Sequence, residues 1–342
     1  MKNMAAKKGP TKVITTGAGY FNLAQRMKDG LVGQDSAVDE ICPFLEIHKA
    51  GLCMKGRPAA IFLLLGPTGS GKTLTAEKLA ECLHGHKDNL LRIDCGEFQM
   101  DHEVAKLIGS PPGYLGHKET TPIINQGKLT GITSLYSNLS IILFDEIEKA
   151  APSMTRLLLG VLDKSTLKLG DNTSVNFDNT IIMLTSNIGA DQLKKEISPD
   201  FGFASFSPTP APAAGRMSSI GSGSAKKRFP PEFMNRIDCV ITYKSLTQND
   251  IDEILDIEVE KIEKHIKDNL ASNAFTISMT SAAREYLVSN GFSKEYGARN
   301  LKRLLNKEIL FPLARMYNAE EIGGGDVAHF SIREGKLDIE VI

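Results

Sequence analysis

The chain has 342 residues, of which 42% are hydrophobic and 24% charged, and its formal net charge is −1. This length predicts two domains, and the balanced charge argues against a general attraction to nucleic acid or membrane surfaces. No apolar run approaches the roughly 20 residues that span a bilayer, and no signal-peptide core follows the N-terminal lysines. The five cysteines are scattered and form no C-x-x-C pair, which is typical of reduced thiols in a cytoplasmic protein.

Residues 1–19 are polar, and we expect a flexible N-terminal segment there. A turn at residues 31–35 precedes an expected helix, with Asp35 or Ser36 as its N-cap. The apolar residues 61–65 then predict a strand that is buried on both faces, as in a parallel sheet.

This strand leads into Gly66-Pro67-Thr68-Gly69-Ser70-Gly71-Lys72-Thr73, which matches the phosphate-binding pattern G-x-x-x-x-G-K-[ST]. The glycines let the backbone curl until several N–H groups point at one centre. Lys72 is expected to reach the outer phosphates and Thr73 to ligate Mg²⁺. A helix over residues 74–83 would place the phosphates at a helix N-terminus. The alternative, a chance glycine-rich turn, is disfavoured because the expected strand and helix flank the loop.

A short strand at residues 89–95 and a helix at 97–108 are expected next. Residues 109–117 hold two prolines and several glycines, so we expect an exposed loop with Tyr114 near its tip. Composition alone leaves open whether Tyr114 points outward or folds back onto the core.

The second apolar strand, residues 140–144, ends in Asp145-Glu146 and resembles a Walker B element. In open α/β sheets ligands bind at the carboxyl ends of the strands, where both carboxylates are expected to lie. Asp145 would hold Mg²⁺ together with Thr73, and Glu146 would orient the attacking water. The alternative is a strand end with two solvated acids, which is disfavoured at this spacing from the phosphate loop.

A helix at residues 152–162 and a third buried strand at 179–187 follow. Asn187 ends this strand and could hydrogen-bond the γ-phosphate or the water, although an asparagine at the end of a strand is also ordinary. Residues 198–228 form a low-complexity loop rich in proline, alanine, serine and glycine. That loop contains the apolar tripeptide Phe201-Gly202-Phe203, and most such apolar islands dock back on their own domain.

Arg236 lies among apolar residues at the end of a short expected helix, and its simplest interpretation is an ion pair with Asp238. A strand at residues 239–243 follows. The rest of the chain is mostly helical, and we place the domain boundary near Tyr243. The expected elements are a helix with apolar positions from 251 to 266, a strand at 275–279, a helix through 286–287, a long helix from 297 through 316, and strands at 327–333 and 336–341.

These motifs occur together in an order that resembles the AAA+ ATPase module of the Clp unfoldases, most closely the second, C-terminal ring of ClpA, ClpB and ClpC. The resemblance covers roughly residues 20–342. It rests on Val32-Gly33-Gln34, the phosphate loop at 66–73, Gly113-Tyr114-Leu115-Gly116, Phe144-Asp145-Glu146-Ile147-Glu148-Lys149-Ala150, Thr185-Ser186-Asn187, Glu232-Phe233-Met234-Asn235-Arg236-Ile237-Asp238 and Gly297-Ala298-Arg299.

The resemblance implies a P-loop α/β domain over residues 20–243, with a parallel sheet sandwiched by helices, and a small, mostly helical lid with short strands over 244–342. It implies ATP and Mg²⁺ as cofactors. Asn187 resembles sensor 1, Arg299 resembles sensor 2, and Arg236 is similar to an arginine finger that reaches the neighbouring subunit's nucleotide. The residues implied to bind the nucleotide are Val32, Gly33, Pro67, Thr68, Gly69, Ser70, Gly71, Lys72, Thr73 and Leu74, with Thr73 and Asp145 at the metal.

The resemblance further implies that Tyr114 is a pore-loop aromatic that grips a threaded polypeptide, since a flat ring packs on any backbone. The chain departs from the family pattern after Gly116, where His117 replaces a second aromatic. The resemblance does not extend to the family's large N-terminal domain, first ATPase ring and middle domain, which we expect to be absent. Phe201-Gly202-Phe203 lies where protease-linked members carry a tripeptide that docks on a peptidase ring, although Phe201 departs from the usual aliphatic residue.

The sequence therefore favours an ATP-driven unfoldase or remodelling chaperone, a homo-oligomeric ring and most simply a hexamer, that threads polypeptide through a central pore. One alternative is an unfoldase subunit that docks on a ClpP-like peptidase. Alternatives of another class are a nucleic-acid-handling AAA+ ATPase, which the near-neutral charge disfavours, and a nucleotide-gated scaffold, which the intact Glu146 disfavours.

Overall fold

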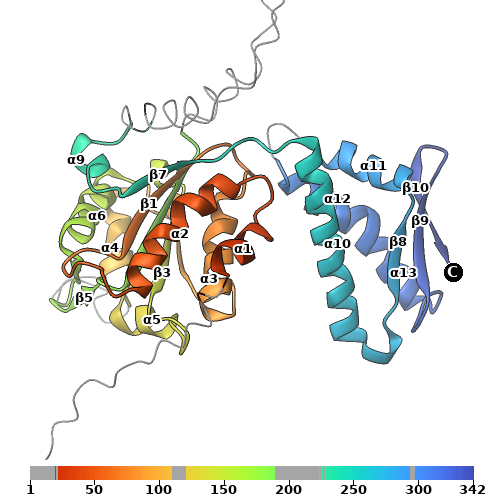
Figure 1. The fold of residues 1–342 in the computed structure, drawn as a ribbon, viewed down its shortest axis with the longest axis horizontal. Helices are drawn as coiled ribbons and strands as arrows, with labels where there is room; N and C mark the ends of the chain where they lie inside the picture. The colour runs from red at the N-terminus through yellow and green to blue at the C-terminus, as the bar shows by residue number, and fades with distance from the viewer. Residues whose placement is uncertain are drawn as a thin grey trace, which may run out of the picture.

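The computed structural model describes residues 20, 22–109, 121–188, 223, 225, 228–292 and 297–342. The chain forms a larger α/β part and a smaller, mostly helical part, which are joined by the segment that follows strand β7 (Figure 1). The described residues contain no helix that is long and apolar enough to cross a membrane.

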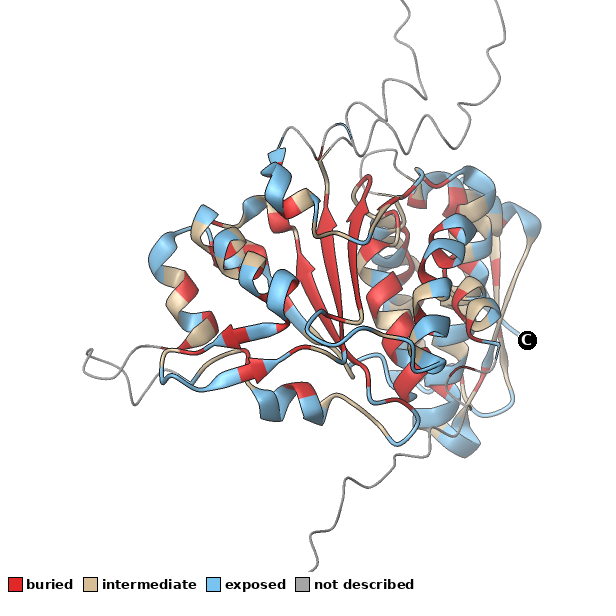
Figure 2. Cartoon of the chain, turned by 60° about the vertical axis from the view of Figure 1, so that its left-hand side comes forward, coloured by how far each residue is buried: buried red, intermediate tan, exposed pale blue. Residues whose placement is uncertain are grey.

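The larger part is built on a five-stranded sheet in which every neighbouring pair is parallel. Every residue of the three central strands is buried, which explains the apolar runs that these strands contain (Figure 2). In spatial order the strands are β2 (Leu91–Asp94), β3 (Ser140–Asp145), β6 (Thr180–Ser186), β1 (Ala60–Leu65) and β7 (Cys239–Thr242). The predicted parallel sheet is confirmed.

The two faces of this sheet have separate cores because successive side chains of a strand point in opposite directions. In β1, Ile61, Leu63 and Leu65 belong to one core, whereas Phe62 and Leu64 belong to the other. Each such side chain contributes roughly 1.5–3 kcal/mol when it is fully buried. The first core includes residues of α4 (Val104–Ile108), α5 (Gln126–Gly131), α6 (Pro152–Lys164) and α9 (Pro231–Met234), and the second includes residues of α1 (Leu23–Lys28), α2 (Asp35–Lys49) and α3 (Lys72–His84).

The prediction of one continuous helix at residues 97–108 is wrong. The structure has the 3-10 turns η1 (Cys95–Glu97) and η2 (Asp101–Glu103) before the short helix α4. Phe98 interrupts the helix because its ring is buried in the core and its carbonyl accepts the N–H of Ala151 at 2.7 Å. That carbonyl is therefore not available to a residue one helical turn later.

Two further details differ from the sequence expectations. Helix α2 begins after Gln34, so neither Asp35 nor Ser36 is its N-cap. The short antiparallel pair β4 (Thr166–Lys168) and β5 (Ser174–Asn176) was not predicted, since three-residue strands carry little periodic signal.

The smaller part surrounds its own core, which includes the predicted apolar face of helix α10 (Gln248–Leu270). A capping box between Thr247 and Asp250 starts that helix. The long helix predicted from residue 297 is interrupted by a π-helical turn, η5 (Asn306–Leu310), directly before Phe311 and Pro312. The other elements are η3 (Ile147–Lys149) in the larger part, and η4 (Ala271–Asn273), β8 (Thr276–Met279), α11 (Ser281–Gly291), α12 (Arg299–Leu305), α13 (Phe311–Asn318), β9 (Val327–Arg333) and β10 (Lys336–Val341) in the smaller.

Several predictions fall on residues outside the described part. These are the flexible segment 1–19, most of the loop 198–228, Tyr114, and the tripeptide Phe201, Gly202 and Phe203. Their predicted roles stay predictions, as does the domain boundary near Tyr243.

Candidate functional site

The glycine-rich loop connects the end of β1 to the first residue of α3 and leaves little room beside its first glycine. Gly66 has φ 150°, and a β-carbon there would come within 2.8 Å of Tyr243 Cβ and 2.9 Å of the Tyr243 carbonyl oxygen. Gly69 and Gly71 have φ values of 75° and 101°, which side chains rarely tolerate. The loop thus has the backbone freedom that a phosphate cradle requires, and it ends at a helix N-terminus.

Lys72 is buried at the start of α3, where all three of its ammonium protons have acceptors. Nζ donates to the carbonyl oxygens of Gly66 and Pro67, at 2.7 Å each, and to Asn187 Oδ1 at 2.9 Å. Burial lowers the pKa of Lys72 from 10.5 to about 8, and the negative charge of Glu148 opposes this shift. The ammonium is therefore held in the loop by neutral oxygens from two strand ends.

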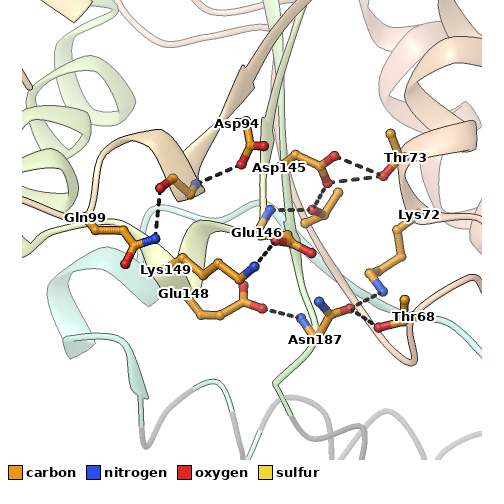
Figure 3. A network of polar contacts seen from close by, with 12 residues as sticks. Thr68, Lys72, Thr73, Asp94, Gln99, Asp145, Glu146, Glu148, Lys149 and Asn187 are labelled. Atoms are coloured by element: carbon orange, nitrogen blue, oxygen red, sulfur yellow. Dashed lines mark hydrogen bonds and ion pairs between the residues drawn. The ribbon is translucent and has the colours of Figure 1, made fainter. Parts of the chain in front are cut away.

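Asp145 lies at the carboxyl end of β3 and collects three polar partners. Thr73 Oγ1 donates to its two carboxylate oxygens at 3.1 and 3.3 Å, and Thr185 Oγ1 donates to Oδ1 at 2.6 Å. Arg92 Nη2, from β2, donates to Oδ2 at 2.5 Å. The structure thus brings the predicted metal residues Thr73 and Asp145 together (Figure 3).

The two glutamates after Asp145 have different partners (Figure 3). Glu146 has a left-handed backbone, with φ 58°, and its Oε2 lies 2.5 Å from Lys149 Nζ. Glu148 Oε1 instead accepts the amide N–H of Asn187 at 3.0 Å. Asn187 is in turn linked to the loop, since its Oδ1 accepts from Lys72 and, at 3.5 Å, from Thr68 Oγ1. Lys72, Asp145 and Asn187 therefore meet at one sheet edge.

The smaller part of the chain reaches this edge through Gly297. A β-carbon on Gly297 would come within 2.7 Å of the Gly69 carbonyl oxygen, so the two backbones are in direct contact. Arg299 follows as the first residue of α12, and its positive charge lowers the pKa of Lys72 further. The exposed guanidinium of Arg299 and the ammonium of Lys72 are thus close enough to influence each other, which favours an anion between them.

Gly33 and Gln34, which follow the half-buried Val32, form another contact between the two parts. A β-carbon on Gly33, whose φ is 74°, would come within 2.9 Å of the Asp250 carboxylate carbon in α10. The buried Gln34 amide donates to the Lys244 carbonyl at 3.0 Å and accepts the Lys244 N–H at 3.2 Å. This segment therefore contacts both the start of α10 and the segment before it.

Arg236 does not form the expected ion pair with Asp238. Its Nε lies 3.3 Å from Asp163 Oδ1 of α6, and Nη1 donates to the Glu232 carbonyl at 2.6 Å. Asp238 pairs with Arg57 instead, at 3.0 Å. Within the described part of the chain these contacts of Arg236 lie away from the phosphate loop, so the structure does not bring Arg236 to the site of its own subunit.

Sequence reasoning missed three residues that organise the site. Arg92 was one of two charged residues in a short expected strand, Thr185 belonged to a motif without a stated role, and Glu148 was the third acid of one short stretch. No local pattern identified Arg92, because it lies at a half-exposed position of the edge strand β2. Among the described residues, no group of three or more His, Cys, Asp and Glu side chains could hold a metal ion.

Residues 57–240 match the family described as AAA domain (Cdc48 subfamily). The chain belongs to this AAA family. Residues 246–330 match the family described as the C-terminal, D2-small domain of ClpB protein. The predicted Clp-type AAA+ ATPase module, with an α/β domain followed by a small helical domain, is confirmed.

Individual relatives agree with the AAA assignment. The chain is 36% identical over 319 residues to the chaperone protein ClpB of Meiothermus ruber, and 36% identical over 317 residues to ClpB of Wolinella succinogenes. These alignments cover 93% of this chain but 34% of each relative. The chain thus spans about a third of the length of these curated relatives.

Solved structures of Hsp104 have the same AAA fold. An extended conformation of the Saccharomyces cerevisiae Hsp104:casein complex matches with a TM-score of 0.78 and 28% identity, over 96% of this chain and 53% of that one. A closed state of Hsp104 with ATPγS and FITC-casein matches with a TM-score of 0.77 and 30% identity, over 94% of this chain and 51% of that one.

Proposed function

We propose that this AAA+ module binds ATP between the sheet edge and the helical lid and hydrolyses it. The observation that carries the proposal is the convergence of Lys72, Asp145 and Asn187 at one edge, with the lid backbone at Gly297 touching the loop at Gly69. Three neutral oxygens now hold the Lys72 ammonium. The outer phosphates are stronger acceptors and would replace them.

The remaining residues take roles in nucleotide binding that follow from their positions. The loop N–H groups of Thr68, Gly69, Ser70, Gly71, Lys72, Thr73 and Leu74 would surround the phosphates. Pro67 has no N–H and would contribute only its place in the turn. Val32 and Gly33 would border the adenine beside the start of α10. Arg299 would contact the outer phosphates from the lid, because its charge already reaches Lys72.

Thr73 and Asp145 fit a magnesium site because a hydroxyl and a carboxylate, both hard oxygen ligands, lie 3.1 Å apart at the loop. When bound, Mg²⁺ neutralises charge on the phosphates. Thr185 keeps Asp145 oriented by donating to Oδ1, which leaves the other carboxylate oxygen to Arg92.

Glu146 would orient and polarise the attacking water, and Asn187 would hold the γ-phosphate or that water. Arg236 would act on the nucleotide of a neighbouring subunit, because in its own subunit it pairs with Asp163. An arginine supplied in this way is worth on the order of 10³–10⁵ in rate in other NTPases. Isolated subunits should therefore be nearly inactive.

We further propose that the ATPase drives polypeptide remodelling in a homo-oligomeric ring, most simply a hexamer. Support comes from relatives that are named chaperone protein ClpB and from the Hsp104 structures that contain casein. Tyr114 would grip the threaded chain. Docking on a peptidase ring through Phe201, Gly202 and Phe203, and a cytoplasmic location, are predictions from the sequence.

The test is phosphate release by the purified chain with and without casein. We expect casein to stimulate ATPase activity, Lys72→Ala to lose nucleotide binding, and Glu146→Gln to bind ATP without turnover. Turnover at the wild-type rate in Glu146→Gln would remove Glu146 from this role. Stimulation by single-stranded DNA, with a strong salt dependence and no response to casein, would favour a nucleic-acid-handling ATPase instead.

A further inference from the structure

The two carboxylate oxygens of Glu148 have different surroundings, and one of them bonds Asn187 of the nucleotide site (Figure 3). Oε1 accepts the amide N–H of Asn187 at 3.0 Å. Oε2 is buried and has no hydrogen-bond partner among the described residues. A buried carboxylate oxygen without a partner is costly, so its retention at this position requires a reason.

The hydrogen bond to Oε1 fixes a strand end that the sheet leaves unsupported on one side. The pairing of β6 with β3 ends at Leu184 and Phe144, so Asn187 lies beyond the last residue pair. Without Glu148 the Asn187 N–H would have no partner from the β3 side. The side-chain Oδ1 of Asn187 accepts from Lys72 Nζ at 2.9 Å. By fixing the main chain of Asn187, Glu148 therefore also fixes the position of the Asn187 side-chain amide.

The charge on Glu148 acts on the phosphate loop as well. Of the charges that act on Lys72, Glu148 has the largest effect, ahead of Asp145, and it attracts the ammonium. Glu148 is also anchored through its own backbone, because Arg228 Nη2 donates to its carbonyl at 3.0 Å. Glu148 is therefore held at its backbone by Arg228 and at one carboxylate oxygen by the main chain after β6.

We propose that Glu148 is a positioning residue for ATP hydrolysis: it fixes the Asn187 main chain, so that the Asn187 side chain meets the reacting phosphate in one orientation. This inference rests on the proposed function. In this role Glu148 acts through Asn187, whose amide N–H it accepts. Glu146, two residues earlier, forms an ion pair with Lys149 and therefore cannot take the place of Glu148.

Two substitutions separate the hydrogen bond from the charge. Glu148→Gln keeps an acceptor oxygen for Asn187, whereas Glu148→Ala removes it. We expect Glu148→Ala to lower kcat about 10-fold, the size of one lost hydrogen bond to a charged group, and to change KM for ATP less than about threefold. Glu148→Gln should keep kcat within about threefold of wild type. The exposed Glu260→Gln in α10 is the control for a neutralised carboxylate, and its kcat should equal that of wild type.

The hydrogen bond between Glu148 and the Asn187 amide can be measured without ATP turnover. Hydrogen exchange at the Asn187 amide should be slow in the wild type and in Glu148→Gln, and fast in Glu148→Ala. Adding Glu148→Ala to Asn187→Ala should lower kcat by less than about twofold, because coupled residues are not additive.

Equal losses in Glu148→Gln and Glu148→Ala, or additive losses in the double variant, would overturn the inference. Thermal unfolding of each variant identifies a loss of fold. A wild-type chain that hydrolyses no ATP contradicts the proposed function. An active wild type whose Glu148→Ala variant keeps its kcat contradicts only the positioning role.

Discussion

Gly297 touches Gly69 through the backbone, and a β-carbon at position 297 would come within 2.7 Å of the Gly69 carbonyl oxygen. Neither group can move aside as the end of a long side chain can, and Gly297 also has φ 52°. We therefore expect Gly297→Ala to separate the lid from the loop and to weaken binding of fluorescent ADP at least about 10-fold, equivalent to about 1.4 kcal/mol.

The matched control is Gly160→Ala in α6, where a β-carbon meets nothing within 4 Å. That variant should be slightly more stable than wild type, because alanine favours a helix by roughly 0.5–1 kcal/mol, and it should bind ADP normally. Equal ADP affinity in Gly297→Ala and wild type would mean that the contact with Gly69 does not support the nucleotide site.

Arg92→Gln removes the cation beside Asp145. Asp145 is buried while Arg92 is half exposed, so we expect the free energy of unfolding to fall by only about 1–2 kcal/mol in urea titrations without nucleotide. Mg²⁺ with ADP should restore most of this loss, since the metal neutralises the same carboxylate. Arg315→Gln, at an exposed position in α13, should lose less than about 0.5 kcal/mol. A loss in Arg92→Gln that Mg²⁺ and ADP do not restore would count against a metal site at Asp145.

Arg236→Ala should be inactive alone and should recover part of its ATPase activity when mixed with Glu146→Gln. In mixed rings an Arg236→Ala subunit supplies an intact Glu146, and its Glu146→Gln neighbour supplies the arginine. Titration of one variant against the other, followed by phosphate release, measures this complementation. If no mixing ratio restores activity, the nucleotide site is not shared between subunits.

The stability of the α/β part should fall as the pH decreases through the titration range of the buried His84 and the half-buried His48. Burial lowers the pKa of His84 and of His48 below the ordinary 6.5. Below that value the unfolded chain binds protons that the folded chain does not, so this stability is present above pH 6.5 and is lost as pH falls through the folded pKa values. Urea unfolding between pH 7.5 and 5 measures the slope.

His84→Leu should reduce that slope, because His84 is buried and its protonation carries a cost of burying a charge. The exposed neighbour His86→Gln is the control and should leave the slope unchanged. An equal slope in His84→Leu and wild type would show that the pH dependence arises elsewhere.

Local sequence patterns were sufficient to predict the sheet and the centre of the site. The runs 61–65 and 141–144 are apolar because both faces of those strands are buried, and parallel strands end at one edge. The contact between Thr73 and Asp145 follows from that arrangement. Asp145 is the last residue of β3, and Thr73 lies at the start of α3, directly after the loop that follows β1.

Features that depend on packing between distant segments could not be predicted in this way. The pairing of Arg236 with Asp163 requires α9 to lie beside α6, and no local pattern encodes that contact. The prediction of a helix over 97–108 was wrong because Phe98 is buried in the core and does not continue a helix. The contact of Gly297 with Gly69 depends on how the lid docks, which periodicity does not report.

The two hydrogen bonds between Gln34 and Lys244 restrict where the lid can pivot. They tie the Lys244 backbone to the α/β part, while Leu246 is already buried in the core of the lid. Only Ser245 lies between these fixed points, and hinge motions are commonly absorbed by a few such residues. A rotation of the lid would therefore turn about Ser245, and the displacement that it causes would grow with distance along α10.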